Sequence, residues 1–258
     1  MIYGLQWVPD HPVYKLHEAV GFFVETGLQQ AAFGDACFPV WFRPVVAASP
    51  ALRSLFDRIF SGIQAEGPAA RTSLVAAWQC QDNIQSICES SAVSLVHCSF
   101  ATAALRKAVA DLFDHLYKDS LVAKTFENAA GGTLAHHYQQ FRNQGQRVCP
   151  FCGLENYKDR DTDTRASYDH FLLRSQYPLA SVNFKNLVPM CDICNEAPNK
   201  GTKDVLFSDR SRTKRRPFCY PYAAVGGITI ALKRASTGSP GRPGRRKVTT
   251  AAATPARK

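Results

Sequence analysis

Two Cys-x-x-Cys pairs are the feature that most constrains what this chain can fold into. Cys149 and Cys152 lie in CPFCG, Cys191 and Cys194 lie in MCDICN, and 38 residues separate the two pairs. Two tight turns that each present two thiolates satisfy tetrahedral zinc and leave no coordination position open. The spacing therefore predicts a structural Zn²⁺ that clamps a polar insert with too few apolar residues to fold alone. A thioredoxin-like redox pair is the alternative, but no strand-helix unit is predicted around either pair.

The remaining composition favours a globular chain in a reducing compartment. Of 258 residues, 45% are hydrophobic, which is enough for a core. The start of the chain has no export signal, and no apolar run is long enough to span a membrane. We therefore expect a cytoplasmic protein without a membrane partner, in which thiols bind metal rather than form disulfides. Five further cysteines lack ligand spacing and are expected to be small buried apolar residues: Cys37, Cys80, Cys88, Cys98 and Cys219.

The net charge of +10 is concentrated near the end of the sequence. Residues 203–258 hold 14 Lys and Arg and only two Asp, whereas the rest of the chain is slightly acidic. Such a segment could follow a polyanion such as nucleic acid or merely keep the protein soluble. Charge alone leaves both interpretations open.

The first part of the chain, residues 1–145, is predicted to be a helical domain of unknown role. Apolar residues recur at helical spacing in four segments, namely residues 12–30, 49–64, 101–119 and 133–145. Ser49 before Pro50 is a helix N-cap followed by proline at the first helical position. His97, His115, His136 and His137 have no partner at metal-ligand spacing and are expected to be surface or satisfied core histidines. The domain could bind a target, dimerise or contact a partner protein.

The rest of the chain is different in kind. Residues 146–222 are rich in Cys, Asp, Asn and aromatic residues, residues 223–235 contain a possible short strand (GGITIAL), and residues 236–258 have the composition of a disordered basic tail. The expected fold class is α+β: a mainly helical N-terminal domain, a zinc-clamped module and a tail.

The insert between the thiol pairs contains residue types that suit metal-assisted hydrolysis. SYDHFLL is predicted to be a short strand with Asp169 and His170, FKNLVPM a second strand with Asn186, and Asn195 follows the second thiol pair. A carboxylate and an amide oxygen suit a hard ion such as Mg²⁺. A neutral imidazole beside that ion can take a proton from water.

These motifs together resemble the HNH endonucleases, which have the ββα-metal fold, in their zinc-bearing branch. The resemblance rests on CPFCG, YDHFLLRSQYP, NLVPMCDICN and NKG, and it covers about residues 147–207. It implies an HNH nuclease module over residues 146–222. Asp169 and Asn195 would hold a catalytic Mg²⁺ or Mn²⁺, His170 would be the general base, and Asn186 would brace the loop that orients the imidazole.

The sequence departs from the family pattern at two places. The expected lysine comes five residues after Asn195, as Lys200, with Pro198 between them, so Asn199 is a second candidate ligand for the ion. Leu173 and Arg174 stand where relatives carry Pro and Lys. Asn186 could instead be a turn residue and Asn195 a helix cap.

The expected function is therefore metal-dependent cleavage of nucleic-acid phosphodiester bonds, with DNA preferred to RNA as partner. Four cations near the site are expected to contact phosphates: Arg174, Lys185, Lys200 and Lys203. The alternatives are a zinc-stabilised nucleic-acid-binding module without cleavage and an interaction protein. A helical companion domain fits a phage-defence nuclease by analogy only. Consecutive strand residues point to opposite faces, so Asp169 and His170 can share a phosphate only where the strand ends or bulges.

Overall fold

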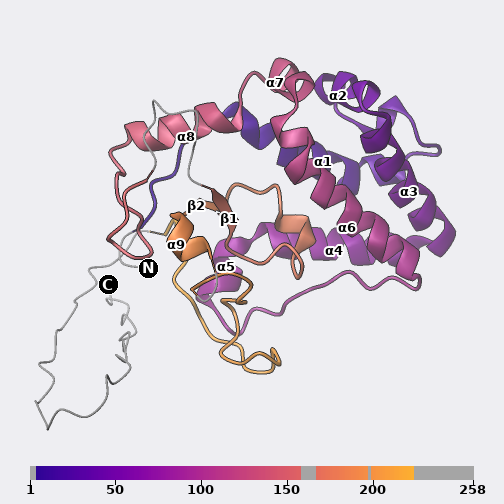
Figure 1. Cartoon of the computed structure of the whole chain (residues 1–258). Helices are drawn as coiled ribbons and strands as arrows, with labels where there is room; N and C mark the ends of the chain where they lie inside the picture. Colours follow the sequence, from indigo (N-terminus) through magenta and orange to yellow (C-terminus); the bar gives the residue numbers. More distant parts are fainter. Residues whose placement is uncertain (1–3, 158–166, 197–198, 224–258) are drawn as a thin grey trace, which may run out of the picture.

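The fold is α+β, with helices throughout the first part of the chain and a small antiparallel hairpin after them (Figure 1). A computed structural model describes residues 4–157, 167–196 and 199–223. The α-helices are α1 (Lys15–Glu25), α2 (Arg43–Ala48), α3 (Pro50–Glu66), α4 (Pro68–Asp82), α5 (Ile84–Glu89), α6 (Ala103–Lys118), α7 (Lys124–Ala130), α8 (Leu134–Asn143) and α9 (Asp192–Asn195). Short 3-10 turns join them: η1 (Pro12–Tyr14), η2 (Gly27–Gln29), η3 (Asp35–Cys37), η4 (Val40–Phe42), η5 (Ser120–Val122) and η6 (Pro178–Ala180).

Helices α3 and α6 begin where the sequence predicts and pack against each other. The Ser49 hydroxyl accepts a hydrogen bond from the Leu52 amide, which caps α3 ahead of Pro50. Gly62 allows the close approach of the two helices, because a Cβ atom there would lie 2.9 Å from Leu105 Cδ1. The four helical segments predicted from periodicity are confirmed as α1, α3, α6 and α8.

The hairpin consists of β1 (Tyr168–His170) and β2 (Leu187–Pro189). The ladder is regular: Tyr168 pairs with Pro189, and His170 pairs with Leu187. The connection between the strands, residues 171–186, contains η6, and β2 runs directly into Cys191 and α9. In Figure 1 the hairpin lies between α8 on one side and α4 and α5 on the other.

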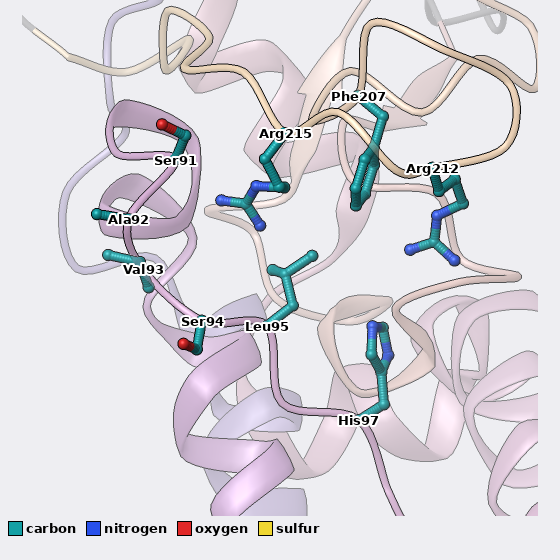
Figure 2. Close-up of a pocket in the computed structure, with 9 residues that line it drawn as sticks. All are labelled: Ser91, Ala92, Val93, Ser94, Leu95, His97, Phe207, Arg212 and Arg215. Carbon is teal, nitrogen blue, oxygen red and sulfur yellow. The ribbon is translucent and has the colours of Figure 1, made fainter.

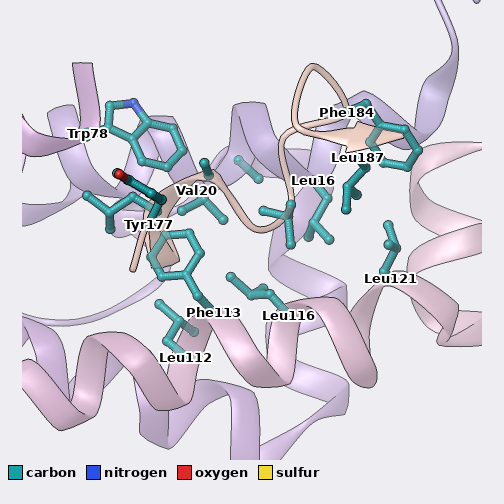
Figure 3. Packing of buried hydrophobic residues seen from close by; sticks show 14 of the residues in the cluster. Leu16, Val20, Trp78, Leu112, Phe113, Leu116, Leu121, Tyr177, Phe184 and Leu187 are labelled. Carbon is teal, nitrogen blue, oxygen red and sulfur yellow. The ribbon is translucent and has the colours of Figure 1, made fainter. Parts of the chain in front are cut away.

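One hydrophobic core spans both the helical part and the hairpin part of the described chain. Figure 3 shows side chains of α1, α4 and α6 together with side chains from the hairpin and its connection. Tyr177, Phe184 and Leu187 are buried at 2% exposure or less, and Tyr177 lies beside Phe113 of α6 in Figure 3. The helices therefore pack against one side of the hairpin and its connection.

The expected burial of the five non-ligand cysteines is confirmed for two of them. Cys37 and Cys88 are fully buried, Cys80 and Cys98 are half-buried, and Cys219 is exposed. The prediction is therefore wrong for Cys219, because its segment runs along the surface. The expected strand in residues 223–235 and the basic tail, residues 236–258, lie outside the described residues apart from Ala223. Among the described helices, none is long and apolar enough to cross a membrane.

Candidate metal centre and active site

The four paired cysteines meet at one place, where they could hold a structural metal such as zinc. Their sulfur atoms all lie within 4.8 Å of one another, and Cys152 Sγ is 3.9 Å from Cys191 Sγ. A tetrahedral zinc with bonds of about 2.3 Å separates its sulfur ligands by about 3.8 Å. The sulfur positions therefore fit a closed four-thiolate site, as the spacing predicts.

Local backbone geometry presents each thiol pair. In the first turn, Gly153 adopts φ 68° and donates its amide to the Cys149 carbonyl at 2.8 Å. That left-handed conformation suits glycine, which has no Cβ. In the second turn, the Cys194 amide donates to Cys191 Sγ at 3.4 Å. Burial raises the pKa of the Cys191 thiol to about 11, and a bound cation would reverse this by stabilising the thiolate.

Asp169 is buried and lies in an ion pair with Lys200. Asp169 Oδ2 is 2.6 Å from Lys200 Nζ, and both side chains are only 10% exposed. Lys200 Nζ also donates to the His170 carbonyl oxygen at 2.7 Å. Burial raises the pKa of the Asp169 carboxyl, and the Lys200 ammonium opposes that shift. Lys200 is thus directed at β1, rather than into solvent as a phosphate contact would be.

The imidazole of His170 is held on two sides. Its Nε2 lies 3.0 Å from the Ser181 carbonyl oxygen, and the Tyr117 ring of α6 packs edge-on at 4.3 Å between centroids. A carbonyl oxygen can only accept, so Nε2 carries the proton and Nδ1 keeps its lone pair. Burial lowers the pKa of His170 to about 4. The ring is therefore a neutral base at physiological pH.

Asn186 is fully buried and ties the two ends of the connection between the strands. Its Oδ1 accepts from the Leu172 amide at 2.6 Å, and its Nδ2 donates to the carbonyl oxygens of Leu172 and Ala180 at 3.0 and 3.2 Å. These bonds fix the backbone next to Ser181, which orients the His170 ring. They are the contacts that a bracing residue needs, and its importance for catalysis stays a prediction.

The two candidate amide ligands differ in their surroundings. Asn195 is the last residue of α9 and half-buried, and its side chain has no hydrogen bond to another described residue. Asn199 is exposed, and its Nδ2 donates to the Ile193 carbonyl oxygen at 2.7 Å. Helix α9 ends at Asn195, before Pro198, as proline in this segment predicts. Asn195 is the less engaged of the two.

The other three predicted phosphate contacts differ in how far their side chains are engaged by the protein. Arg174 Nη1 lies 2.7 Å from Asp114 Oδ1 of α6, and its guanidinium lies over the Tyr117 ring. Lys185 and Lys203 are exposed. Of the four cations, these two lysines are the exposed ones, and their contact with phosphate stays a prediction.

Asp169 and His170 follow each other within a regular stretch of the ladder, in register with Val188 and Leu187. No bulge separates them, and His170 is the last residue of β1. At this end of the strand, Lys200 Nζ contacts both the Asp169 carboxylate and the His170 carbonyl oxygen. Convergence of both side chains on a single phosphate stays a prediction.

Three residues around the imidazole were missed from the sequence. Tyr117 and Asp114 come from α6, and Ser181 contributes only its backbone carbonyl. Tyr117 also donates its hydroxyl to the Tyr168 carbonyl at 3.1 Å. A main-chain acceptor leaves no trace in the residue type, and the helix residues are distant in sequence. No local pattern could have identified them.

We expect Lys200→Met to destabilise the protein by about 3–5 kcal/mol, because it leaves a buried carboxylate without its partner. Urea unfolding of the variant at neutral pH measures this loss. The double variant Asp169→Asn with Lys200→Met removes both charges and should be more stable than Lys200→Met alone. Equal stability of Lys200→Met and wild type would show that the ion pair does not form.

A second group of buried histidines joins the N-terminal segment to α8 and β1. His137 is bonded through Nδ1 to the Tyr168 hydroxyl and through Nε2 to the Tyr14 hydroxyl at 2.9 Å, and His11 Nε2 lies 3.3 Å from His136 Nδ1. His11 and His137 are only 2% and 3% exposed. His137 is thus a satisfied core histidine, as expected.

These histidines predict loss of stability in acid. Burial, together with neighbouring His136, lowers the pKa of His11 to about 4 and that of His137 to about 3. Below about pH 6.5 these histidines are protonated in the unfolded chain but stay neutral in the folded chain. Each such histidine lowers the free energy of unfolding by about 1.4 kcal/mol per pH unit between pH 6.5 and its pKa in the folded protein. In urea titrations from pH 7 to 5, His137→Gln should show a shallower fall than wild type. Parallel curves would contradict this.

The chain was compared with protein-family models, with curated proteins and with solved structures, and none of the three comparisons found a match. The family resemblance therefore rests on the motifs of the sequence alone.

Proposed function

We propose that this protein hydrolyses phosphodiester bonds in nucleic acid, DNA before RNA, through an HNH-type ββα-metal module clamped by zinc. The observation that carries the proposal is the arrangement of His170. Its Nε2 donates to the Ser181 carbonyl, so Nδ1 keeps the lone pair that can accept a proton. A neutral imidazole fixed in one tautomer is what a general base for water needs.

The proposed division of labour follows from the positions of the side chains. His170 takes the proton of the attacking water at Nδ1, while Tyr117 and the Ser181 carbonyl keep the ring from rotating. Asn186 holds the connection that carries Ser181. Because Ser181 and Asn186 are fully buried and Tyr117 is half-buried, the base is positioned before substrate binds.

The donor set near β1 fits a divalent ion in its chemistry. Asp169 offers a carboxylate and Asn195 an amide oxygen, both of which Mg²⁺ and Mn²⁺ accept as ligands. When bound, such an ion neutralises charge on the phosphoryl group and stabilises the leaving oxygen. Lys200 holds Asp169 Oδ2, so the ion would use Oδ1 or displace the ammonium.

The same ion pair supports a second candidate function, a zinc-stabilised nucleic-acid-binding module that does not cut. In that case Lys200 permanently neutralises Asp169, and no divalent ion is needed. The exposed Lys185 and Lys203 would serve binding in either case. Dependence of cleavage on divalent ions separates the two candidates.

A magnesium titration of plasmid nicking tests the proposal and the choice of ligand. Wild type should nick supercoiled DNA only with Mg²⁺ or Mn²⁺. Asn195→Ala should need at least tenfold more Mg²⁺, a loss of about 1.4 kcal/mol in ion binding, because its amide has no other described partner. Asn199→Ala is the matched control and should stay within about threefold of wild type.

The outcomes of this titration are distinct. A larger effect of Asn199→Ala than of Asn195→Ala would move the ion to Asn199. No cleavage of DNA or RNA by wild type under any divalent ion would contradict the nuclease and favour the binding module.

A further inference from the structure

A cavity of about 400 Å³ lies apart from the residues of the proposed active site (Figure 2). One wall is the segment after α5, residues 91–97, and the other is the segment from Phe207 to Arg215. Its size falls in the range of small-molecule sites. The lining residues include Arg212, Arg215 and His97 but no acidic side chain. The cavity is therefore suited to an anion.

Arg215 carries a charge that the described protein does not offset. Its Nη2 donates to the carbonyl oxygens of Ile87 and Ser90, at 2.9 and 3.1 Å, at the end of α5. Its Nε and Nη1 are buried without a hydrogen-bond partner. No carboxylate in the described part of the chain lies within 4.0 Å of it. Arg215 as a whole is half-buried, and its partners are two carbonyl oxygens and the Phe207 ring, none of which carries a negative charge. An anion in the adjoining cavity would supply that charge.

Arg212 stands on the same wall and is held firmly. Its Nε lies 3.0 Å from Asp204 Oδ2, and its Nη2 donates to the Tyr177 hydroxyl at 3.0 Å. The backbone of Arg212 has φ 55°, an unfavourable left-handed conformation for a residue with a Cβ. The Phe207 ring lies between the two guanidinium groups, 5.0 Å from that of Arg212 and 5.8 Å from that of Arg215. Both cations are thus fixed beside the cavity.

The opposite wall adds apolar surface and hydroxyl groups. Val93 and Leu95 are half-buried apolar residues, and Ser91 and Ser94 are exposed serines. Inorganic phosphate would need only the cationic wall. A ligand that uses both walls has an anionic group and a flat or apolar body of small-molecule size.

We propose that this cavity binds a nucleoside phosphate, with its phosphate directed to Arg215 and its base and sugar against Leu95 and Val93. Arginine suits phosphate because its planar donors match the phosphate oxygens. The nucleoside phosphate could be a free mononucleotide or one unit of a nucleic-acid strand, and the two sources share this chemistry. The site is independent of the proposed cleavage reaction.

Calorimetric titration of the full chain with AMP, without added divalent ion, tests the proposal. AMP should bind one to one and at least tenfold more tightly than adenosine, which lacks the phosphate. Ser94→Glu places a carboxylate at an exposed position of the cavity wall and should weaken AMP binding at least tenfold. Ser54→Glu, at an exposed position of α3 outside the cavity, is the matched control and should change binding less than twofold.

Arg215→Gln is a second test and should also weaken AMP binding. Circular dichroism must show that this variant is folded, because Arg215 also anchors α5. Competition by a 5′-phosphorylated thymidine pentanucleotide identifies the source: displacement of AMP indicates a strand, and no displacement indicates a free nucleotide. The assignment is overturned if AMP binds no tighter than adenosine, or if Ser94→Glu and Ser54→Glu bind AMP equally.

Discussion

Cys149→Ala is expected to abolish metal binding by the four-cysteine cluster and to unfold the hairpin segment. Cys149 is fully buried, and its amide and carbonyl bind Glu155 and Gly153 in the first turn. The described hairpin is only two three-residue strands, too short to be stable by itself. Structural zinc sites contribute about 10–16 kcal/mol in small zinc domains, so losing one of four ligands removes a large share of stability. Zinc content and thermal melting of the variant measure this loss.

Cys219→Ala is the matched control for that experiment. Cys219 is exposed and lies outside the thiol cluster, so its replacement should leave zinc content and melting temperature unchanged. A Cys149→Ala protein with wild-type zinc content and wild-type melting would contradict the structural metal site. In that case the clustering of the sulfur atoms would have to come from packing alone.

The local features of the fold could be predicted from the sequence. Ser49 and Pro50 mark the start of α3 because capping depends on a few neighbouring residues. The spacing of the cysteines predicted their clustering, since two short turns can present thiols without knowledge of the rest of the fold. The strand predicted around Asp169 and His170 is likewise present, as β1.

The surroundings of the site could not be predicted, because they are made by tertiary contacts. Tyr117 meets His170 from a helix about fifty residues earlier, and periodicity shows only that α6 has a buried face. Lys200 was expected to face phosphate, yet its side chain folds back onto Asp169. Helix α4 was also missed, since its run of Ala, Ser, Thr and Gln has a weak apolar stripe. Position in a sequence does not reveal which charges will pair.

His170→Ala is expected to lower the rate of magnesium-dependent DNA cleavage by about 10²–10⁴-fold, the usual contribution of a general base. The variant removes Nδ1 but keeps the backbone carbonyl that Lys200 binds and leaves Asp169 in place. Zinc content should therefore stay at the wild-type level. His115→Ala is the matched control, because His115 lies on α6 and pairs with Asp119 instead of the site.

The rate constant for nicking of supercoiled plasmid in saturating Mg²⁺, measured for wild type, His170→Ala and His115→Ala at equal zinc content, tests the central claim most directly. We predict fast nicking by wild type and His115→Ala and a loss of at least a hundredfold for His170→Ala. Full magnesium-dependent nicking by His170→Ala would contradict the claim that the clamped hairpin presents this imidazole as the catalytic base.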